Sequence, residues 1–137
     1  MAQPTTSPPL PRDTKVLTIG LHPRGLDYSQ MPEGLDEAVL TARIEAGNAA
    51  VREAGLDAVP CLVDSSPARA EATIREHLGE GPFGLALIGG GVRMMPGHTL
   101  LFERIVNVLI EAQPGIRLCF NTSPEETIDV LKRWIQV

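Results

Sequence analysis

Residues 58–63 have the sequence Ala-Val-Pro-Cys-Leu-Val, a short apolar run with a proline at position 60. An apolar run of this length is typical of a strand that is buried on both faces of a sheet. Proline has no N–H to donate to a neighbouring strand, so it is found on edge strands or at bulges. Pro60 therefore predicts that this strand lies at the edge of its sheet.

Four apolar runs of this kind alternate along the chain with four helical patterns. Strands are expected at residues 16–21, 58–63, 83–88 and 116–120, and helices at 35–54, 66–79, 99–112 and 123–135. This alternation predicts a parallel sheet covered by helices on both faces. With Pro60 on an edge strand, the strand order 2-1-3-4 is favoured over 3-2-1-4. Right-handed crossovers then put the first and last helices on one face and the middle two on the other.

The expected helices carry recognisable start and stop signals. Ser66 and Pro67 are an N-cap residue and a proline at the first helical position, and Ser123 and Glu126 have the spacing of a capping box. Gly55 follows the first helix as a stop signal. Helical spacing through Leu35, Val39, Ala42, Ala46, Ala49 and Ala50 predicts that helix.

The alternating pattern resembles the flavodoxin-like superfold over residues 15–136. Flavodoxins carry a Ser/Thr-rich phosphate loop after the first strand, where this chain has His22 to Gly25, and response-regulator receivers carry an aspartate where it has Gly89. The resemblance implies a three-layer, doubly wound α/β fold of the flavodoxin-like or Rossmann-like kind, and it points to no particular cofactor. Residues 1–13, with four prolines, are expected to be a disordered tail, and residues 14–137 a single α/β domain.

Composition argues against several classes of partner. The chain has 12 Lys and Arg residues against 17 Asp and Glu residues, and its net charge of −5 argues against a nucleic-acid partner. No apolar run approaches the roughly 20 residues that span a bilayer, and no apolar signal peptide is expected. Cys61 and Cys119 are expected to be buried free thiols, and the predicted location is cytoplasmic. No metal site is predicted, because no His, Cys and carboxylate residues are closely spaced.

Ligands of open α/β sheets bind at the carboxyl ends of the strands, where the strand order reverses. That point lies between the first and third strands, and the third ends in Gly89-Gly90-Gly91-Val92-Arg93. Such a turn exposes N–H groups that suit an anion, and Arg24 or Arg93 could add charge-assisted contacts. The alternative is a flexible turn with a solvated arginine. The predicted ligand-binding residues are Arg24, Gly89, Gly90, Gly91, Arg93, Asn121 and Ser123.

The candidate catalytic residues are His22, Asp64 and Ser65, which follow the first two strands. His22 could be a general base, a ligand contact or a hydrogen-bonded loop residue. Asp64 or Ser65 could orient it, and the three could form a hydrolase triad, although the chain has no G-x-S-x-G elbow. The sequence leaves open whether the chain is an enzyme. We expect a small-molecule domain for an anionic ligand, with a non-catalytic, homo-oligomeric binding or scaffold module as the alternative.

The connection from His22 to Gly34 is longer than most strand-to-helix loops. We predict that it folds over the strand ends as a lid, with Tyr28 or Met31 facing the cleft. A mobile surface loop is the alternative.

A homodimer is predicted through helix 99–112 and strand 116–120. At about 100° per residue, the apolar arc of this helix covers roughly 200°, more than one sheet face requires. Strand 116–120 would be an open edge whose one charge is Arg117. The alternative is that the last helix or the N-terminal tail covers both features.

Overall fold

The structure is a computed structural model that describes residues 9–136. Its strands are β1 (Lys15–Leu21), β2 (Asp57–Val63), β3 (Leu85–Ile88) and β4 (Arg117–Phe120). Its α-helices are α1 (Glu37–Glu53), α2 (Pro67–Leu78), α3 (Gly90–Arg93), α4 (Thr99–Ala112) and α5 (Thr127–Lys132). Three short 3₁₀ turns are η1 (Pro23–Gly25), η2 (Tyr28–Gln30) and η3 (Pro124–Glu126).

The predicted fold class and strand order are confirmed. The four strands form a parallel sheet in the order β2-β1-β3-β4, as in flavodoxin-like and Rossmann-like folds. Pro60 lies on the edge strand β2, where it pairs in register with Thr18 of β1. The His22 N–H donates to the Val63 carbonyl, so by alternation Val63 and Cys61 bond to β1 and the nitrogen of Pro60 faces the open edge.

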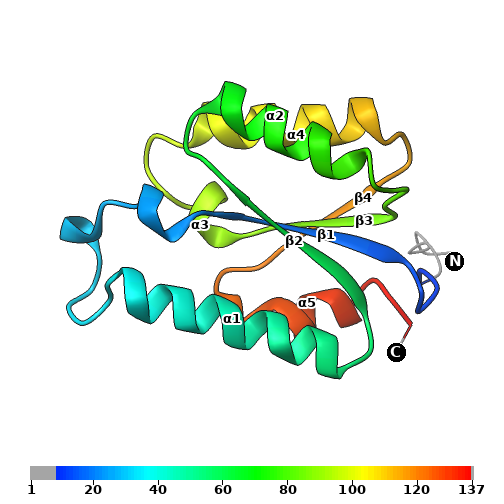
Figure 1. The fold of residues 1–137 in the computed structure, drawn as a ribbon, viewed down its shortest axis with the longest axis horizontal. Coiled ribbons are helices and arrows are strands. Elements are labelled where there is room, and N and C mark those ends of the chain that lie inside the picture. The colour runs from blue at the N-terminus through cyan, green and yellow to red at the C-terminus, as the bar shows by residue number, and fades with distance from the viewer. Residues whose placement is uncertain (1–8, 137) are drawn as a thin grey trace, which may run out of the picture.

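Helices cover both faces of the sheet as predicted, with α1 and α5 on one face and α2 and α4 on the other (Figure 1). The side chains beneath α2 and α4 form one buried cluster, which includes Leu17, Ile19 and Ile88. The side chains beneath α1 and α5 form a second cluster, which includes Val16 and Leu85. Within residues 9–136, no helix has both the length and the apolar character that crossing a bilayer requires.

Several predicted helix signals are present in the structure. The Ser66 hydroxyl accepts the Arg69 N–H at the start of α2, and Gly55 has a φ of +80° just after α1. The last helix is shorter than predicted: a 3₁₀ turn replaces its first turn, and α5 ends at Lys132. Ser123 makes no side-chain cap, because the Glu126 carboxylate instead accepts the N–H and hydroxyl of Thr122.

The residues whose spacing predicted α1 do not all face the sheet. Val39 is 41% exposed, and Ala42 and Ala46 are also exposed. The residues that face the sheet include Leu40 and Ile44 instead. The helix is weakly amphipathic because small alanine side chains occur all around it, so spacing alone did not identify its inner face.

Both ends of the described chain lie at the amino edge of the sheet (Figure 1). Leu10 and Ile135 form a parallel bridge, in which the Leu10 N–H donates to Trp134 and the Gln136 N–H donates to Leu10. Residues 1–8 of the predicted disordered tail lie outside the described residues.

The turn after β4 holds α1 in place. A Cβ atom on Gly47 would lie 2.6 Å from the Pro124 carbonyl oxygen, so only glycine allows the helix backbone to approach so closely. One turn earlier, the Arg43 guanidinium donates two hydrogen bonds of 2.7 Å to the Glu125 carboxylate. This bidentate pair lowers the pKa of Glu125 to about 2.

We expect the Gly47→Ala substitution to destabilise the protein. Alanine normally improves a helix interior over glycine by about 1 kcal/mol, but overpacking against a backbone carbonyl costs about 1–3 kcal/mol. Chemical denaturation measures the net change. Gly91→Ala is the control, because its Cβ would meet its nearest neighbour, Leu21, at 3.8 Å. A more stable Gly47→Ala variant would show that α1 is not held this closely.

A second prediction concerns the pH dependence of the Arg43–Glu125 pair. The pKa of Glu125 is lowered from 4.5 to about 2, so the pair stabilises the folded state above pH 4.5 and this contribution is lost as the pH falls toward 2. Its size is modest, because both side chains are partly exposed. In Arg43→Met, carboxyl NMR titration should find the pKa of Glu125 raised toward 4.5, because the guanidinium is the largest cause of its low value. An unchanged, low pKa in this variant would assign the shift to another group.

Candidate functional site

On the face covered by α1 and α5, the amino half of the sheet is well packed. Alternate strand residues point toward these helices, and here they include Val16, Leu85 and Cys119. These side chains pack with Val51 of α1 and Leu131 of α5 in a buried cluster. This half of the α1 face therefore has no room for a ligand.

The carboxyl half of the same face is hollow. Leu87 on β3 continues the alternation with a large side chain, but Thr18 and Gly20 on β1 and Gly89 after β3 are small. They leave a cavity of about 120 Å³ between the sheet and α1. Since an apolar cavity of about 150 Å³ holds one benzene molecule, this one is suited to a small ring. Its lining residues are Thr18, Ile19, Gly20, Leu21, Leu26, Leu40, Ile44, Asn48, Pro60, Leu62, Leu87, Gly89, Gly90, Gly91, Asn121, Thr122, Ser123, Pro124 and Thr127.

Helix α1 forms the wall of the cavity opposite the sheet. Its lining residues Leu40, Ile44 and Asn48 are four positions apart, so they lie along one side of the helix. Val51, which comes next along this side, is 1% exposed and belongs to the packed cluster. Asn48 therefore lies at the inner end of the cavity, and Leu40 lies nearer the carboxyl edge of the sheet.

A buried hydrogen-bond network shapes the glycine-rich turn. The Gly90 N–H donates to Asn121 Oδ1 at 3.0 Å, and Asn121 Nδ2 donates to the Thr127 hydroxyl at 3.1 Å. That hydroxyl in turn donates to the Pro124 carbonyl at 2.8 Å. Asn121 thus ties the turn after β3 to the turn after β4, and the hydrogen bonds of this network satisfy its buried polar atoms.

His22 and Arg24 interact with each other in the η1 turn. His22 Nδ1 accepts the Arg24 backbone N–H at 3.2 Å, and the Arg24 guanidinium lies against the same ring. His22 thus makes hydrogen bonds within its own loop. Neither residue is among those that line the cavity.

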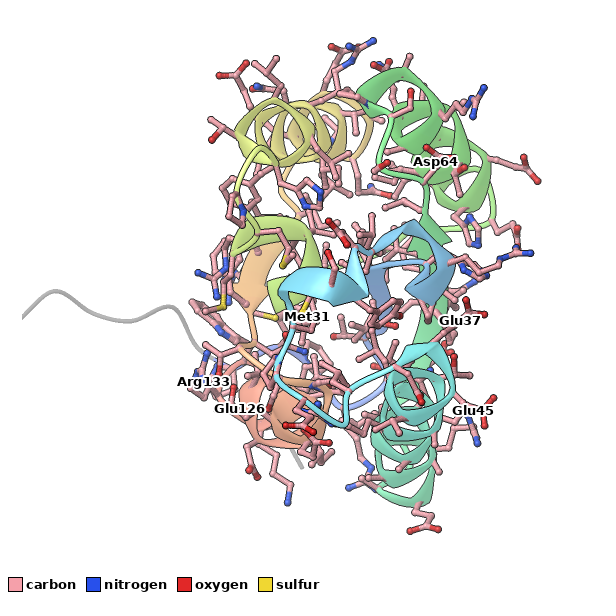
Figure 2. The ribbon with its side chains drawn as sticks, turned by 90° about the vertical axis from the view of Figure 1, so that its left-hand side faces the viewer. Met31, Glu37, Glu45, Asp64, Glu126 and Arg133 are labelled. Atoms are coloured by element: carbon pink, nitrogen blue, oxygen red, sulfur yellow. The ribbon has the colours of Figure 1, made fainter. Side chains whose placement is uncertain are left out.

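Asp64 and Ser65 lie at the start of α2. The Asp64 carboxylate accepts the Ser66 N–H at 2.7 Å, which lowers the pKa of Asp64, and it pairs with Arg69 at 3.5 Å. In the described part of the chain, no hydrogen bond joins His22 to Asp64 or Ser65. Figure 2, which looks onto the carboxyl edge of the sheet, shows Asp64 beside α2 and Glu126 beside α5 on the opposite side.

The guanidinium of Arg93 lies on the side of the glycine-rich turn that faces away from the cavity. It donates to the Asn121 carbonyl at 3.0 Å, and its Cζ lies 5.5 Å from the centre of the Phe120 ring. Phe120 packs with the cluster beneath α2 and α4. Arg93 therefore interacts with the opposite face of the sheet from the cavity.

The structure brings together five of the seven residues predicted to bind a ligand. Gly89, Gly90, Gly91, Asn121 and Ser123 all line the cavity. The candidate catalytic residues His22, Asp64 and Ser65 and the two arginines, Arg24 and Arg93, are not among the lining residues.

The predicted lid contributes a different side chain from those expected. The loop crosses in front of the carboxyl edge of the sheet, as its labelled residue Met31 shows in Figure 2. Leu26 lines the cavity, whereas Tyr28 and Met31 do not. The Tyr28 hydroxyl instead donates to the Pro23 carbonyl at 2.6 Å, which folds the loop on itself.

Sequence patterns missed Asn48, Thr18 and Thr127. Asn48 is not among the residues whose spacing predicted α1, and Thr18 lies in the middle of an apolar strand. The one available signal was that each of these polar residues lies within an apolar segment. This signal points to a binding site only once it is known which residues of α1 face the sheet.

The cavity is electrically neutral in its lining. None of the described lining residues carries a charged side chain.

Burial raises the pKa of both Cys61 and Cys119 to about 12, so the two thiols are uncharged. Among residues 9–136, no group of three His, Cys, Asp or Glu side chains could hold a metal ion.

Comparison with known proteins adds no family to these observations. The chain matches no protein-family model, and neither a curated protein nor a solved structure is significantly similar to it.

Proposed function

We propose that this protein binds a small, uncharged organic molecule of about the size of one ring in the cavity beneath α1. The observation that carries the proposal is the hollow carboxyl half of the sheet, where Gly20 and Gly89 replace the side chains that fill the amino half. The cavity adjoins the ends of β1 and β3, where the strand order reverses. Open α/β sheets bind ligands at this position.

The neutral lining favours an uncharged ligand over the anion expected from the sequence. Burying a charge without a charged partner costs several kcal/mol or more. Arg24 and Arg93 would have supplied that partner, but Arg24 lies against His22, and Arg93 binds the Asn121 carbonyl. The proposal is for binding, without a reaction, because His22, Asp64 and Ser65 are not among the lining residues.

An NMR titration with four probes tests this function. We expect the uncharged rings δ-valerolactam and cyclohexanone to shift the amide signals of Gly20, Gly89 and Gly91 at millimolar concentration. Acetate and inorganic phosphate should leave these signals unchanged. The substitution Gly20→Ala should weaken binding of both rings by about fivefold or more, because its Cβ occupies cavity space.

This substitution is suited to the test because it spares the fold. Its Cβ would meet Leu62 at 3.6 Å, an ordinary contact, and alanine is better tolerated than glycine in a strand. The matched control is Gly25→Ala, which has the same 3.6 Å spacing to Leu21 but lies outside the cavity lining. Signals that respond to the anions alone, or to none of the probes, would refute the proposal.

A second candidate function is a homodimeric binding module, and the open edge of β4 favours it. The Arg117 N–H donates to the Gly84 carbonyl, so by alternation the N–H and C=O groups of Leu118 face away from β3. An antiparallel pair of β4 strands, related by a two-fold axis at Leu118, would let each Leu118 exchange both hydrogen bonds with its counterpart. The edge is therefore complementary to a second copy of itself.

Helix α4 adds an apolar stripe beside this edge. Phe102, Val106 and Ile110 are four positions apart, and the rings of Phe102 and Phe120 lie 6.0 Å apart. Ile110 is 52% exposed. The other side of α4 binds α2, through the ion pairs of Arg104 with Glu71 and of Glu111 with Arg75. Because α5 lies on the opposite face of the sheet (Figure 1), it does not cover the stripe.

Sedimentation equilibrium tests the dimer. We expect wild type to sediment at micromolar concentration as twice the chain mass of 14.7 kDa, and Ile110→Glu to be monomeric. The matched control Leu100→Glu should remain dimeric, because Leu100 is also exposed, at 67%, but lies off the Phe102 stripe.

A monomeric wild type would refute the dimer. If a variant lacking residues 1–8 then dimerised, that segment would be the occupant of the edge. Dissociation by both substitutions would place the interface elsewhere on α4.

A further inference from the structure

Six polar side chains line the cavity, and five of them have a partner. Thr18 donates to the Val59 carbonyl, Asn121 and Thr127 belong to the buried network, and Thr122 binds Glu126. Ser123 donates to Glu125. In the part of the chain that the structure describes, the side-chain amide of Asn48 is the exception, with neither its oxygen nor its nitrogen in a hydrogen bond.

The position of Asn48 makes this amide unusual. It lies on the same side of α1 as Leu40 and Ile44, and it is followed one turn later by the buried Val51. The side of a helix that faces a sheet is normally apolar. Asparagine is also a poorer helix former than leucine, and an unpaired amide in a half-buried position weakens the fold. Packing therefore gives no reason for an asparagine here.

We propose that Asn48 recognises an amide-like edge of the ligand, in which an N–H donor lies beside a C=O acceptor. This inference rests on the proposed binding function and names the chemical class of the ligand. The Asn side chain presents one acceptor and one donor in a single plane. A lactam, a primary carboxamide or a nucleobase edge presents the complementary pair and forms two parallel hydrogen bonds with it.

The rest of the cavity fits this orientation of the ligand. Ile44, Leu62 and Leu87 also line the cavity, and they provide apolar contacts for the body of the molecule. The Thr18 hydroxyl already donates to the Val59 carbonyl, so its oxygen remains able to accept a further bond near the inner end. A ligand that binds Asn48 is thus uncharged and polar at its inner end, with an apolar body.

A pair of matched probes separates amide recognition from simple cavity filling. δ-Valerolactam and cyclohexanone are six-membered rings with a carbonyl, but the lactam alone carries the adjacent N–H. We expect the full-length wild type to bind the lactam about threefold to tenfold more tightly, as one additional hydrogen bond implies. NMR titration of the Gly20 and Gly89 amide signals measures both affinities.

The variant Asn48→Leu should lose this preference and bind both rings equally, while its stability is retained or increased. The control Ile44→Val, one turn away on the same side of α1, removes one methyl group from the apolar wall and should change the affinity for both rings alike, so that the preference for the lactam is kept. A preference that persists in Asn48→Leu, or is absent from wild type, would overturn the role of Asn48 while leaving the cavity a binding site. If neither ring binds to wild type, the binding function itself is refuted and this inference with it.

If Asn48→Leu fails to fold, the wild-type protein alone decides the question. A preference for the lactam, together with lactam-dependent shifts of the Asn48 side-chain NH₂ signals, would support the proposal, and unshifted signals would overturn it.

Discussion

The close approach of α1 to the turn after β4 determines where side chains can pack between α1 and the sheet and where a cavity remains. With no side chain at Gly47, the helix backbone lies against the Pro124 carbonyl, and the Arg43–Glu125 pair holds the adjacent turn. At its carboxyl end, α1 is held by the buried side chain of Val51. The helix is therefore supported at the turn after β4 and at the amino half of the sheet, and it passes over the ends of β1 and β3 without packing on them.

The segment 121–127 contributes to both walls of the cavity. Its asparagine fixes the glycine-rich turn through Gly90, and its Pro124 and Glu125 position α1. A shift of this segment would therefore alter the floor of the cavity and the helix above it together. Since the Asn121–Thr127 network is buried and hydrogen-bonded, such a shift would break bonds that water could not replace at once. The network therefore fixes the shape of the cavity, although no large side chains pack inside it.

The strand order of the sheet was predictable because it depends on the chemistry of a single residue. Pro60 lacks a donor, so its place on an edge strand followed from one residue, and the strand order followed from that edge. The inner face of α1 was not predictable, because its alanines make opposite sides of the helix nearly equal in hydropathy, and the tertiary contact at Gly47 decides between them. The sequence placed Arg93 correctly in the segment that follows β3, where it ends α3, but did not reveal the carbonyl that it binds or the side of this segment on which it lies. Five of the predicted ligand-binding residues meet in one cavity because parallel strands bring their carboxyl ends to a common edge.

The bridge between Leu10 and Ile135 has a practical consequence for handling the protein. It holds the first and last described strand-like segments side by side at the amino edge of the sheet (Figure 1), whereas the cavity is lined by residues at the carboxyl ends of β1 and β3. A fusion partner or surface anchor attached beyond either residue would leave from the end remote from the ligand entrance. The proximity of the two ends also suits a circularly permuted chain, in which a short linker joins them and new termini are opened in an exposed loop such as the one after α2.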